Sequence, residues 1–356
     1  MNARRFTSAL LAVLILAMAL VGCSSGAQPT SQQPGDASQA GSTGSGTDEN
    51  KHITFITPLI AHESWLIAKE GFDAAAADLG FEAEWVGPAN QDVNEMIKYI
   101  EIAIAQNVTG IITQGQNPEA MVEVLQKAAD AGIPVVICDS TIEDAPQLAY
   151  IGFDMKKAAD LAVEQSIREL GEGTPINALF LTTAIDYSAA NVGYVYFNEA
   201  LEAQATGEYK MQQQETKGDP ITARQLIEAT LQADPTINTI YCIDGIAAPA
   251  AVAVLEDMGR LDDVCIIGID DTDEQLDLIR AGKISAVTYG SFYKQAYQGC
   301  LWILEYRENG SRPEHMYNDV GTMLITADNV DTYKATANDP STWGSYEPLS
   351  YIDEQS

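Results

Sequence analysis

The body of the chain alternates short apolar runs rich in Ile and Val with longer segments of helical period, and this alternation constrains the fold more than any other feature. Strands that are buried on both faces have continuous apolar sequences, whereas helices that cover a sheet carry apolar residues three and four positions apart. Regular strand–helix alternation is typical of parallel sheets covered by helices. The sequence therefore predicts an α/β fold from Lys51 onward.

The predicted elements form two similar series. The first has strands at 53–57, 82–86, 110–113 and 134–138 and helices at 64–79, 92–106 and 118–131. A weak strand near Tyr150 and a helix at 155–170 lead to the second, with strands at 176–181, 209–215, 239–243, 265–269 and 286–289 and helices at 189–205, 220–233, 247–258 and 272–281. We predict two doubly wound, Rossmann-like units of about five strands each.

The first fifty residues differ from this body. Arg4 and Arg5 precede an apolar run from Ala9 to Val21, which is shorter than the ~20 residues that span a bilayer but suits a signal-peptide core. The run ends in Leu-Val-Gly-Cys and resembles the bacterial lipobox, whose cysteine is acylated before cleavage. The resemblance implies a lipoprotein signal peptide at 1–22 and lipidation of Cys23.

Residues 23–50 are rich in Ser, Gly, Gln and Thr, and after Cys23 they contain no large apolar side chain. Such a segment cannot bury enough surface to order itself, so we predict a flexible tether. The chain is therefore expected to be lipid-anchored on the extracytoplasmic face of the cell membrane. The body carries most of the 51 acidic residues, against 19 Lys and Arg in all. That balance excludes a nucleic-acid partner, which would require clustered cations.

The four cysteines of the body, Cys138, Cys242, Cys265 and Cys300, lie far apart in apolar stretches and form no C-x-x-C motif. We predict that they are small buried hydrophobes. An exported protein could pair Cys242 with Cys265, but neighbouring parallel strands rarely offer the required geometry. No pattern of metal ligands and no glycine-rich phosphate loop occurs, so we expect neither metal nor cofactor.

Polar and aromatic side chains follow the predicted strands, at the edge where parallel sheets bind ligands. Carboxylates and amides accept hydrogen bonds from hydroxyls, and aromatic faces cover the C–H surface of a sugar ring. The residues selected in this way are His62, Ser64, Trp65, Gln114, Asp139 and Ser140 in the first unit, and Tyr187, Asn191, Asp244, Asp270 and Tyr289 in the second. Because cations are nearly absent among them, the set predicts a neutral polyhydroxylated ligand.

Structural roles remain open for some of these residues. Trp65 begins an amphipathic helix and could belong to the core as well as stack on a ligand. Asp139 could cap a turn. Asp270 stands in a group of acids that a helix dipole would favour, and it is the one of that group to which we assign a ligand contact.

Three segments, 57–71, 131–139 and 266–270, resemble the periplasmic sugar-binding protein family typified by ribose-binding protein, and the similarity extends over 51–329. The resemblance implies a type I fold, in which two lobes joined by three crossings at a hinge close on a sugar and deliver it to an ABC permease. It places the lobes at 51–153 plus 290–320 and at 154–289 plus 321–338, with a tail at 339–356. The family's ligand-binding positions fall on His62, Ser64, Trp65, Asp139, Asp244 and Asp270.

The chain departs from the family pattern at three places. Ser140 stands where an Arg is common, Gly193–Phe197 replaces an R-x-x-G-F run, and Gly290 replaces a Gln. Two sugar-gripping arginines are thus missing, so pentose identity does not carry over. Residues 85–88 and the pair Asp139-Ser140 look closer to the branch that contains rhamnose-binding and autoinducer-two-binding proteins.

The sequence contains few motifs that are typical of enzymes. The chain has no G-x-S-x-G elbow, and among the predicted strand ends only His62 supplies a histidine. Asp139 and Asp270 could in principle form a glycosidase pair, although we expect them on different lobes. We therefore expect no enzyme but a monomeric solute-binding lipoprotein that serves an ABC permease. The alternatives are a sensory subunit for a kinase or chemoreceptor, and a binder of a furanone signal or a nucleoside.

Overall fold

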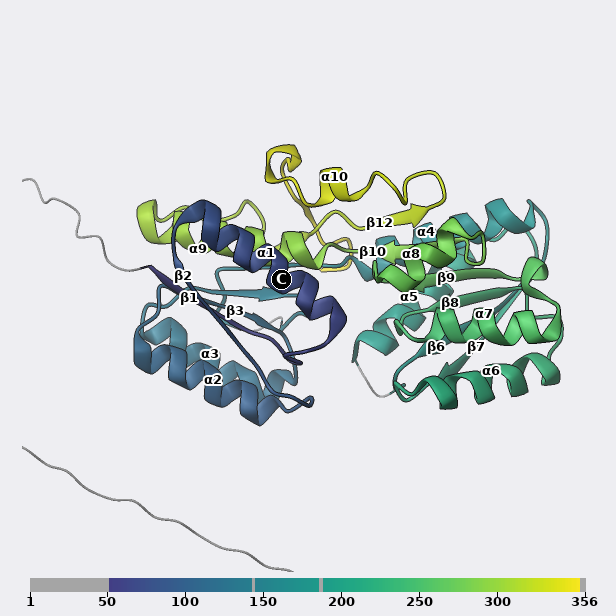
Figure 1. Ribbon diagram of the computed structural model, residues 1–356, viewed down its shortest axis with the longest axis horizontal. Helices are drawn as coiled ribbons and strands as arrows, with labels where there is room; N and C mark the ends of the chain where they lie inside the picture. The colour runs from purple at the N-terminus through teal and green to yellow at the C-terminus, as the bar shows by residue number, and fades with distance from the viewer. Residues whose placement is uncertain (1–50, 143–144, 186–187, 353–356) are drawn as a thin grey trace, which may run out of the picture. The chain divides into compact units, whose positions relative to one another are not determined.

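The computed structural model describes residues 51–142, 145–185 and 188–352, although the side chains of 118 and 188–191 are excluded from this description (Figure 1). These residues form two α/β lobes, each built on its own sheet, and this confirms the predicted fold class. The predicted signal peptide, the tether and Cys23 lie outside the described residues.

The first lobe contains a seven-stranded sheet in the order β13-β11-β5-β4-β3-β1-β2. All neighbouring strands are parallel except β13, which is antiparallel to β11. The central strands have continuous apolar sequences and are buried. In β4 (Val135–Cys138), for example, every residue is buried. The strands are β1 (His52–Ile56), β2 (Glu82–Val86), β3 (Gly110–Gln114), β4 (Val135–Cys138), β5 (Ala149–Gly152), β11 (Tyr317–Asp319) and β13 (Glu347–Pro348).

Four helices cover the two faces of this sheet. Helices α1 (Glu63–Leu79) and α9 (Phe292–Asn309) pack on one face, and α2 (Val93–Gln106) and α3 (Pro118–Asp130) pack on the other (Figure 1). Gly71 lets α1 approach α9 closely, because a Cβ at this position would lie 2.1 Å from the carbonyl oxygen of Tyr293. The N-terminus of α2 is capped by Asp92, whose carboxylate accepts hydrogen bonds from the backbone N–H groups of Asn94 and Glu95 at 2.9 and 3.2 Å.

The second lobe repeats this arrangement with a six-stranded sheet in the order β12-β10-β9-β8-β6-β7. Five of its strands are parallel, and β12 is antiparallel to β10. Helices α4 and α5 pack on one face and α6, α7 and α8 on the other. The strands are β6 (Ile176–Thr182), β7 (Tyr209–Glu215), β8 (Thr239–Cys242), β9 (Cys265–Ile269), β10 (Ala286–Tyr289) and β12 (Met323–Thr326), and the helices are α4 (Met155–Leu170), α5 (Ser188–Gln204), α6 (Pro220–Ala233), α7 (Ala247–Met258) and α8 (Asp273–Arg280).

The two lobes share one strand order, since β2-β1-β3-β4-β5 corresponds to β7-β6-β8-β9-β10. This is the flavodoxin-like order of doubly wound sheets, in which ligands collect beyond the carboxyl ends of the strands. Residues that follow equivalent strands therefore hold equivalent places in the two lobes.

The chain passes between the lobes more often than the resemblance implies. Three crossings join β5 to α4, β10 to α9, and β11 to β12. A fourth leads from β12 through the short helices α10 (Lys334–Ala337) and η2 (Pro340–Thr342) to β13 in the sheet of the first lobe. Residues 339–352, predicted to be only a tail, are thus part of the folded body.

Within the described ranges, every helix is either too short or too polar to span a bilayer. Cys138, Cys242, Cys265 and Cys300 are all free and buried, so β8 and β9 carry no disulfide between Cys242 and Cys265. Burial raises the pKa of the Cys265 thiol to about 11.

Candidate functional site

A cavity of about 850 Å³ opens between the lobes, at the carboxyl ends of both sheets. Its volume lies within the roughly 300–1,000 Å³ that is usual for small-molecule sites. The first lobe contributes residues from the loops after β1 and β4 and from α1, α3 and α9. The second lobe contributes residues from the ends of β6 and β9, from the segments that follow β6, β8 and β9, and from α4 and α5. Phe153 and Gly290 of the crossings complete the lining, together with Tyr351 near the C-terminus.

Asp139 and Asp270 occupy equivalent positions, directly after β4 and β9, the fourth strand of each lobe in sequence. Both have left-handed backbone conformations, with φ of 64° and 71°, which Asp and Asn adopt more readily than other residues with a side chain. The Tyr150 hydroxyl donates to the carbonyl oxygen of Asp139 at 2.7 Å, and the Asp270 N–H donates to the carbonyl oxygen of Thr288 at 3.0 Å. These bonds fix the turns that bring both carboxylates to the cavity.

In the first lobe, the Asp139 carboxylate is held by two neighbours. The Gln114 side-chain amide donates to it, and the Ser140 hydroxyl lies 3.5 Å away. Burial raises the pKa of Asp139, whereas these hydrogen bonds and the charge of His62 oppose the rise. Gln114 itself is buried and does not line the cavity, so it positions Asp139 from behind.

In the second lobe, two carboxylates reach the cavity. Asp244 follows β8 and accepts a hydrogen bond from the hydroxyl of buried Thr216. Asp270 accepts a hydrogen bond from Ser64 of the first lobe, with the oxygens 3.1 Å apart, and this contact joins the lobes across the cavity. Burial raises the pKa of Asp270 to about 7, and the charges of the neighbouring aspartates add to the rise.

Aromatic rings form the apolar part of the lining. Trp65 is 5% exposed and packs edge-on against Phe55 and Phe292, with ring centroids 6.2 and 5.3 Å apart. It therefore belongs to the core of the first lobe and also lines the cavity, where its stacking on a ligand stays a prediction. His62 precedes α1, and its exposed side chain makes no capping bond.

Of the eleven predicted ligand residues, seven line the cavity: His62, Ser64, Trp65, Asp139, Ser140, Asp244 and Asp270. Tyr289 does not. Its ring packs edge-on against Tyr333 at 5.3 Å, because β10 directs Tyr289 and Val287 into the core shared with α7 and α8. Tyr187 and the side chain of Asn191 lie outside the described residues.

Several lining residues were not predicted. Thr182 and Thr183 stand at the end of β6, where the rule applied to the other strands would have found them. Glu119, Met155 and Tyr196 come from helices, and nothing in their local sequence distinguishes them from other surface positions. Tyr351 could not be predicted, because the C-terminal segment had been assigned to neither lobe.

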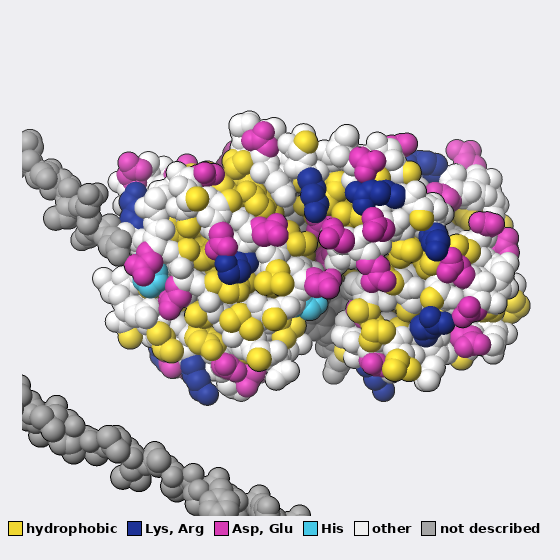
Figure 2. Space-filling view, in the orientation of Figure 1, with side chains coloured by type: hydrophobic (Ala, Val, Ile, Leu, Met, Phe, Trp, Pro, Cys, Tyr) yellow, Lys and Arg dark blue, Asp and Glu magenta, His cyan; other side chains and the backbone are white. Residues whose placement is uncertain are grey.

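The described lining of the cavity is acidic, and His62 is the one basic residue type in it. Asp139, Asp244, Asp270 and Glu119 line the described cavity, and no Lys or Arg does so. On the face drawn in Figure 2, acidic side chains also gather where the lobes meet. Carboxylates in this setting act as hydrogen-bond acceptors for hydroxyl or amine groups of a ligand and would repel an anion.

A family model described as the periplasmic binding protein domain matches residues 53–310. The chain is 26% identical over 286 residues to a D-apiose import binding protein of Actinobacillus succinogenes, which covers 79% of this chain and 90% of that protein. It is 24% identical over 284 residues to a D-ribose/D-allose-binding protein of Pseudomonas aeruginosa, covering 76% of this chain and 86% of that protein.

Among solved structures, a sugar-binding protein of a sugar ABC transporter from Bacillus halodurans superposes with a TM-score of 0.73 and 25% sequence identity. The match covers 80% of this chain and 100% of that chain.

Proposed function

The chain belongs to the periplasmic binding protein domain family, and we propose that it is an extracytoplasmic solute-binding protein that captures a small sugar or sugar derivative and delivers it to an ABC permease. One observation carries the proposal: carboxylates from equivalent turns of the two lobes, Asp139 and Asp270, line one cavity of small-molecule size. A ligand held by both lobes at once stabilises the closed state more than the open one, so binding drives closure without chemistry.

The lining supports a polyhydroxylated ligand. Asp139, Asp244 and Asp270 can accept hydrogen bonds from hydroxyls, and Trp65 and Phe292 offer apolar ring surface to the C–H groups of a sugar. The names of the relatives, which refer to apiose, ribose and allose, favour the same ligand class. Because Ser140 and Gly290 replace the Arg and Gln common in the family, we propose a sugar or derivative and not a particular pentose.

The membrane anchor is part of the proposal. The basic start, the apolar run and Cys23 favour a lipoprotein, and residues 24–50 would then connect the anchored cysteine to the folded body. Metabolic labelling with a palmitate analogue tests this. We expect label on the wild type and none on Cys23→Ser, and label on both would refute the assignment.

A thermal-shift panel tests the ligand class. A ligand that binds only the native state raises stability by about 2.7 kcal/mol at a hundredfold excess over its Kd. We expect a rise in Tm with one or more of the pentoses, hexoses, deoxy sugars or polyols. A rise only with nucleosides, or only with a furanone signal, would overturn the sugar class.

Uptake measurements separate transport from sensing. If the protein delivers its ligand, a deletion strain should lose uptake of the sugar that gives the largest thermal shift. Normal uptake together with loss of sugar-dependent gene expression would instead indicate a sensory subunit.

A further inference from the structure

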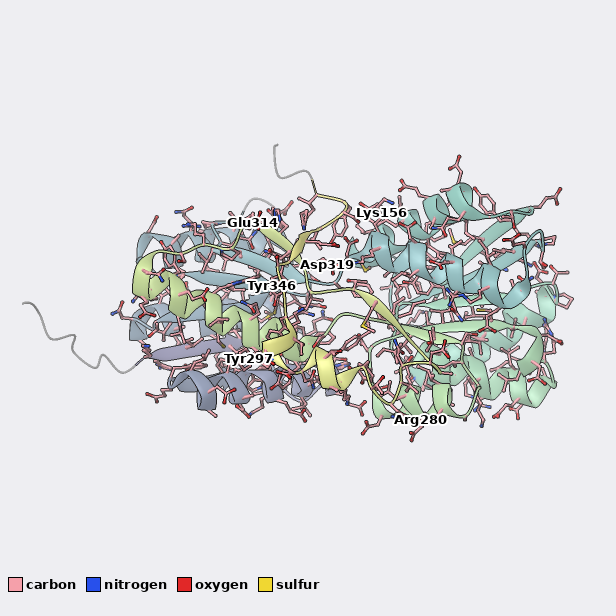
Figure 3. All side chains as sticks on the ribbon, turned by 90° about the horizontal axis from the view of Figure 1, so that it is seen from above. Lys156, Arg280, Tyr297, Glu314, Asp319 and Tyr346 are labelled. Carbon is pink, nitrogen blue, oxygen red and sulfur yellow. The ribbon has the colours of Figure 1, made fainter. Side chains whose placement is uncertain are left out.

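The fourth crossing between the lobes, here called the C-terminal strap, comprises residues 327–352. In Figure 3 the strap, drawn in yellow, lies over the place where the chain passes between the lobes. It leaves the second lobe after β12 and enters the first-lobe sheet as β13, where Asn318 and Asp319 of β11 pair with Pro348 and Glu347. The strap is therefore attached to both sheets.

Aromatic contacts fasten the strap to α9. The Trp343 ring lies edge-on to Tyr297 at 5.4 Å, and the Tyr346 ring lies edge-on to Trp302 at 5.3 Å. The Tyr346 hydroxyl donates to Gln298 at 2.9 Å. The Lys294 ammonium lies 5.3 and 4.7 Å from the centres of the Trp343 and Tyr346 rings, within the range of a cation–π contact.

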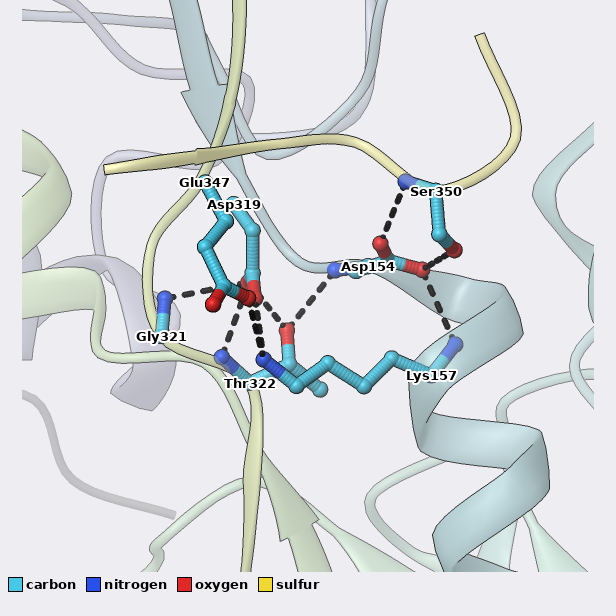
Figure 4. A network of polar contacts seen from close by, with 7 residues as sticks. All are labelled: Asp154, Lys157, Asp319, Gly321, Thr322, Glu347 and Ser350. Carbon is cyan, nitrogen blue, oxygen red and sulfur yellow. Dashed lines mark hydrogen bonds and ion pairs between the residues drawn. The ribbon is translucent and has the colours of Figure 1, made fainter.

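Polar contacts fasten the strap to two of the other crossings (Figure 4). The buried Asp154 carboxylate, in the first crossing, accepts bonds from the backbone N–H and the hydroxyl of Ser350 at 2.7 and 2.8 Å. Lys157 of α4 lies 2.8 Å from Asp319, at the start of the third crossing, and 3.4 Å from Glu347 of the strap. The strap thus binds the segments that must rotate if the lobes move apart.

The last described turn of the strap reaches the ligand cavity. Tyr351 packs beside the core of the first lobe, lines the cavity, and meets Tyr196 of α5 in the second lobe with ring centroids 5.4 Å apart. One side chain of the strap therefore contacts both lobes at the cavity wall. Opening the lobes would separate Tyr351 from Tyr196, because Tyr351 packs beside the core of the first lobe and Tyr196 belongs to α5 of the second.

We propose that the C-terminal strap holds the two lobes closed and that its Tyr351 forms a ligand-facing wall of the cavity, so that the strap contributes to both closure and affinity. The affinity part rests on the proposed sugar-binding function, whereas the closure part does not. Loss of the Tyr351 ring removes an inter-lobe aromatic contact of a kind that changes an equilibrium about two- to tenfold.

Closure is measured without a ligand by electron spin resonance distances between labels on the two lobes. Glu123→Cys on α3 and Glu228→Cys on α6 provide exposed attachment sites, and the four cysteines of the folded body, Cys138, Cys242, Cys265 and Cys300, are buried. In ligand-free protein, Tyr351→Ala should shift the distance distribution toward longer values, and Tyr351→Phe should shift it less. Tyr209→Ala, on the exposed edge of the second lobe, is the matched control and should not shift it.

Affinity is measured by calorimetry with whichever of D-ribose, D-allose, D-xylose and myo-inositol gives the largest thermal shift. Tyr351→Ala should weaken binding about two- to tenfold while Tyr209→Ala leaves it unchanged. Unchanged distances and unchanged affinity in Tyr351→Ala would overturn the inference. Longer distances in a protein that binds none of these sugars would support the closing role while counting against the proposed function.

Ser350→Ala offers an independent variant if Tyr351→Ala fails to fold. It removes the hydroxyl bond to Asp154 and leaves the cavity lining intact, because Ser350 does not line the cavity. We expect a smaller shift in the same direction. Distances identical to those of the wild type would contradict the role of the strap in closure.

Discussion

Replacing Asp270 with Asn should stabilise the ligand-free protein at neutral and alkaline pH. Asp270 is surrounded by acids, and burial together with the charges of Asp139, Asp271 and Asp244 raises its pKa from 3.8 to about 7. The folded state therefore binds this proton more tightly than the unfolded state does. Asn removes the charge, adopts the left-handed φ of 71° as readily as Asp, and retains an oxygen that can accept the Ser64 hydrogen bond.

The size of the effect follows from linkage. A pKa rise of about three units corresponds to about 4 kcal/mol at 1.36 kcal/mol per unit. Asp270 keeps some contact with solvent in the cavity, and the screening there reduces the expected gain to about 1–2 kcal/mol. For a folded body of about 300 residues the gain amounts to a rise in Tm of about 2–3 °C.

The effect of Asp270→Asn on stability depends on pH. Between about pH 4 and pH 7 the folded protein binds more protons at Asp270 than the unfolded chain, so stability from this group falls as the pH rises through that window. Asp270→Asn should therefore exceed the wild type in Tm at pH 8 and match it near pH 4. Thermal unfolding followed by circular dichroism measures both, with exposed Asp262→Asn as the control.

A gain in Tm of Asp270→Asn that is the same at pH 4 and pH 8, or no gain at pH 8, would refute this reasoning. Sugar binding provides the counterpart. A charged acceptor makes stronger hydrogen bonds than a neutral amide, so the same variant should bind the sugar about tenfold more weakly at pH 7.5. Asp270→Asn should therefore be more stable than the wild type and bind the sugar more weakly. This combination is expected if the Asp270 carboxylate destabilises the ligand-free protein and improves ligand binding.

Three further outcomes are expected. Asp139→Ala should weaken sugar binding by at least about 1.5 kcal/mol in a calorimetric titration, and unchanged affinity there and in Asp270→Ala would remove both carboxylates from the site. Gly71→Ala should lower the free energy of unfolding by about 1–3 kcal/mol in urea titrations, because its Cβ would lie 2.1 Å from the Tyr293 carbonyl oxygen, whereas Gly344→Ala, with open space around it, should not. Cys138, Cys242, Cys265 and Cys300 should react with a thiol reagent only after unfolding, and rapid labelling of the folded body would contradict their burial.

The elements up to Tyr289 were predictable because each has one dominant period. Several boundaries, such as those of α4, α6, α7 and β9, coincide with the prediction, and most others shift by one residue at a cap. Helix α9 escaped notice for a physical reason. It is buried continuously from Gln295 to Cys300, and this stretch includes Gln295 and Gln298, so its polar and apolar residues do not separate into two faces and no helical period is evident.

The site shows the same division. Residues directly after a strand could be found from the sequence, since the strand order fixes where they lie, and this rule placed Asp139, Asp244 and Asp270 at the cavity. Tyr289 is the last residue of β10, and its side chain follows the alternation of the strand into the core. Successive side chains of a strand point to opposite faces of the sheet, so a shift of the strand end by one residue decides whether a side chain enters the core or the cavity. A continuous apolar sequence does not locate the strand end to within one residue.

The equivalence of Asp139 and Asp270 links the fold to the way the site would work. Each carboxylate ends the fourth strand of its lobe in a left-handed turn, so the two-lobed repeat brings two acids toward one cavity. Without a ligand their repulsion opposes closure, and the Ser64 hydroxyl and the contact of Tyr351 with Tyr196 offset it. A ligand that donates hydroxyl hydrogens to both acids would relieve that cost in the closed state alone. Its affinity for the closed state would therefore exceed its affinity for the open state, which is the condition for a ligand to shift a conformational equilibrium.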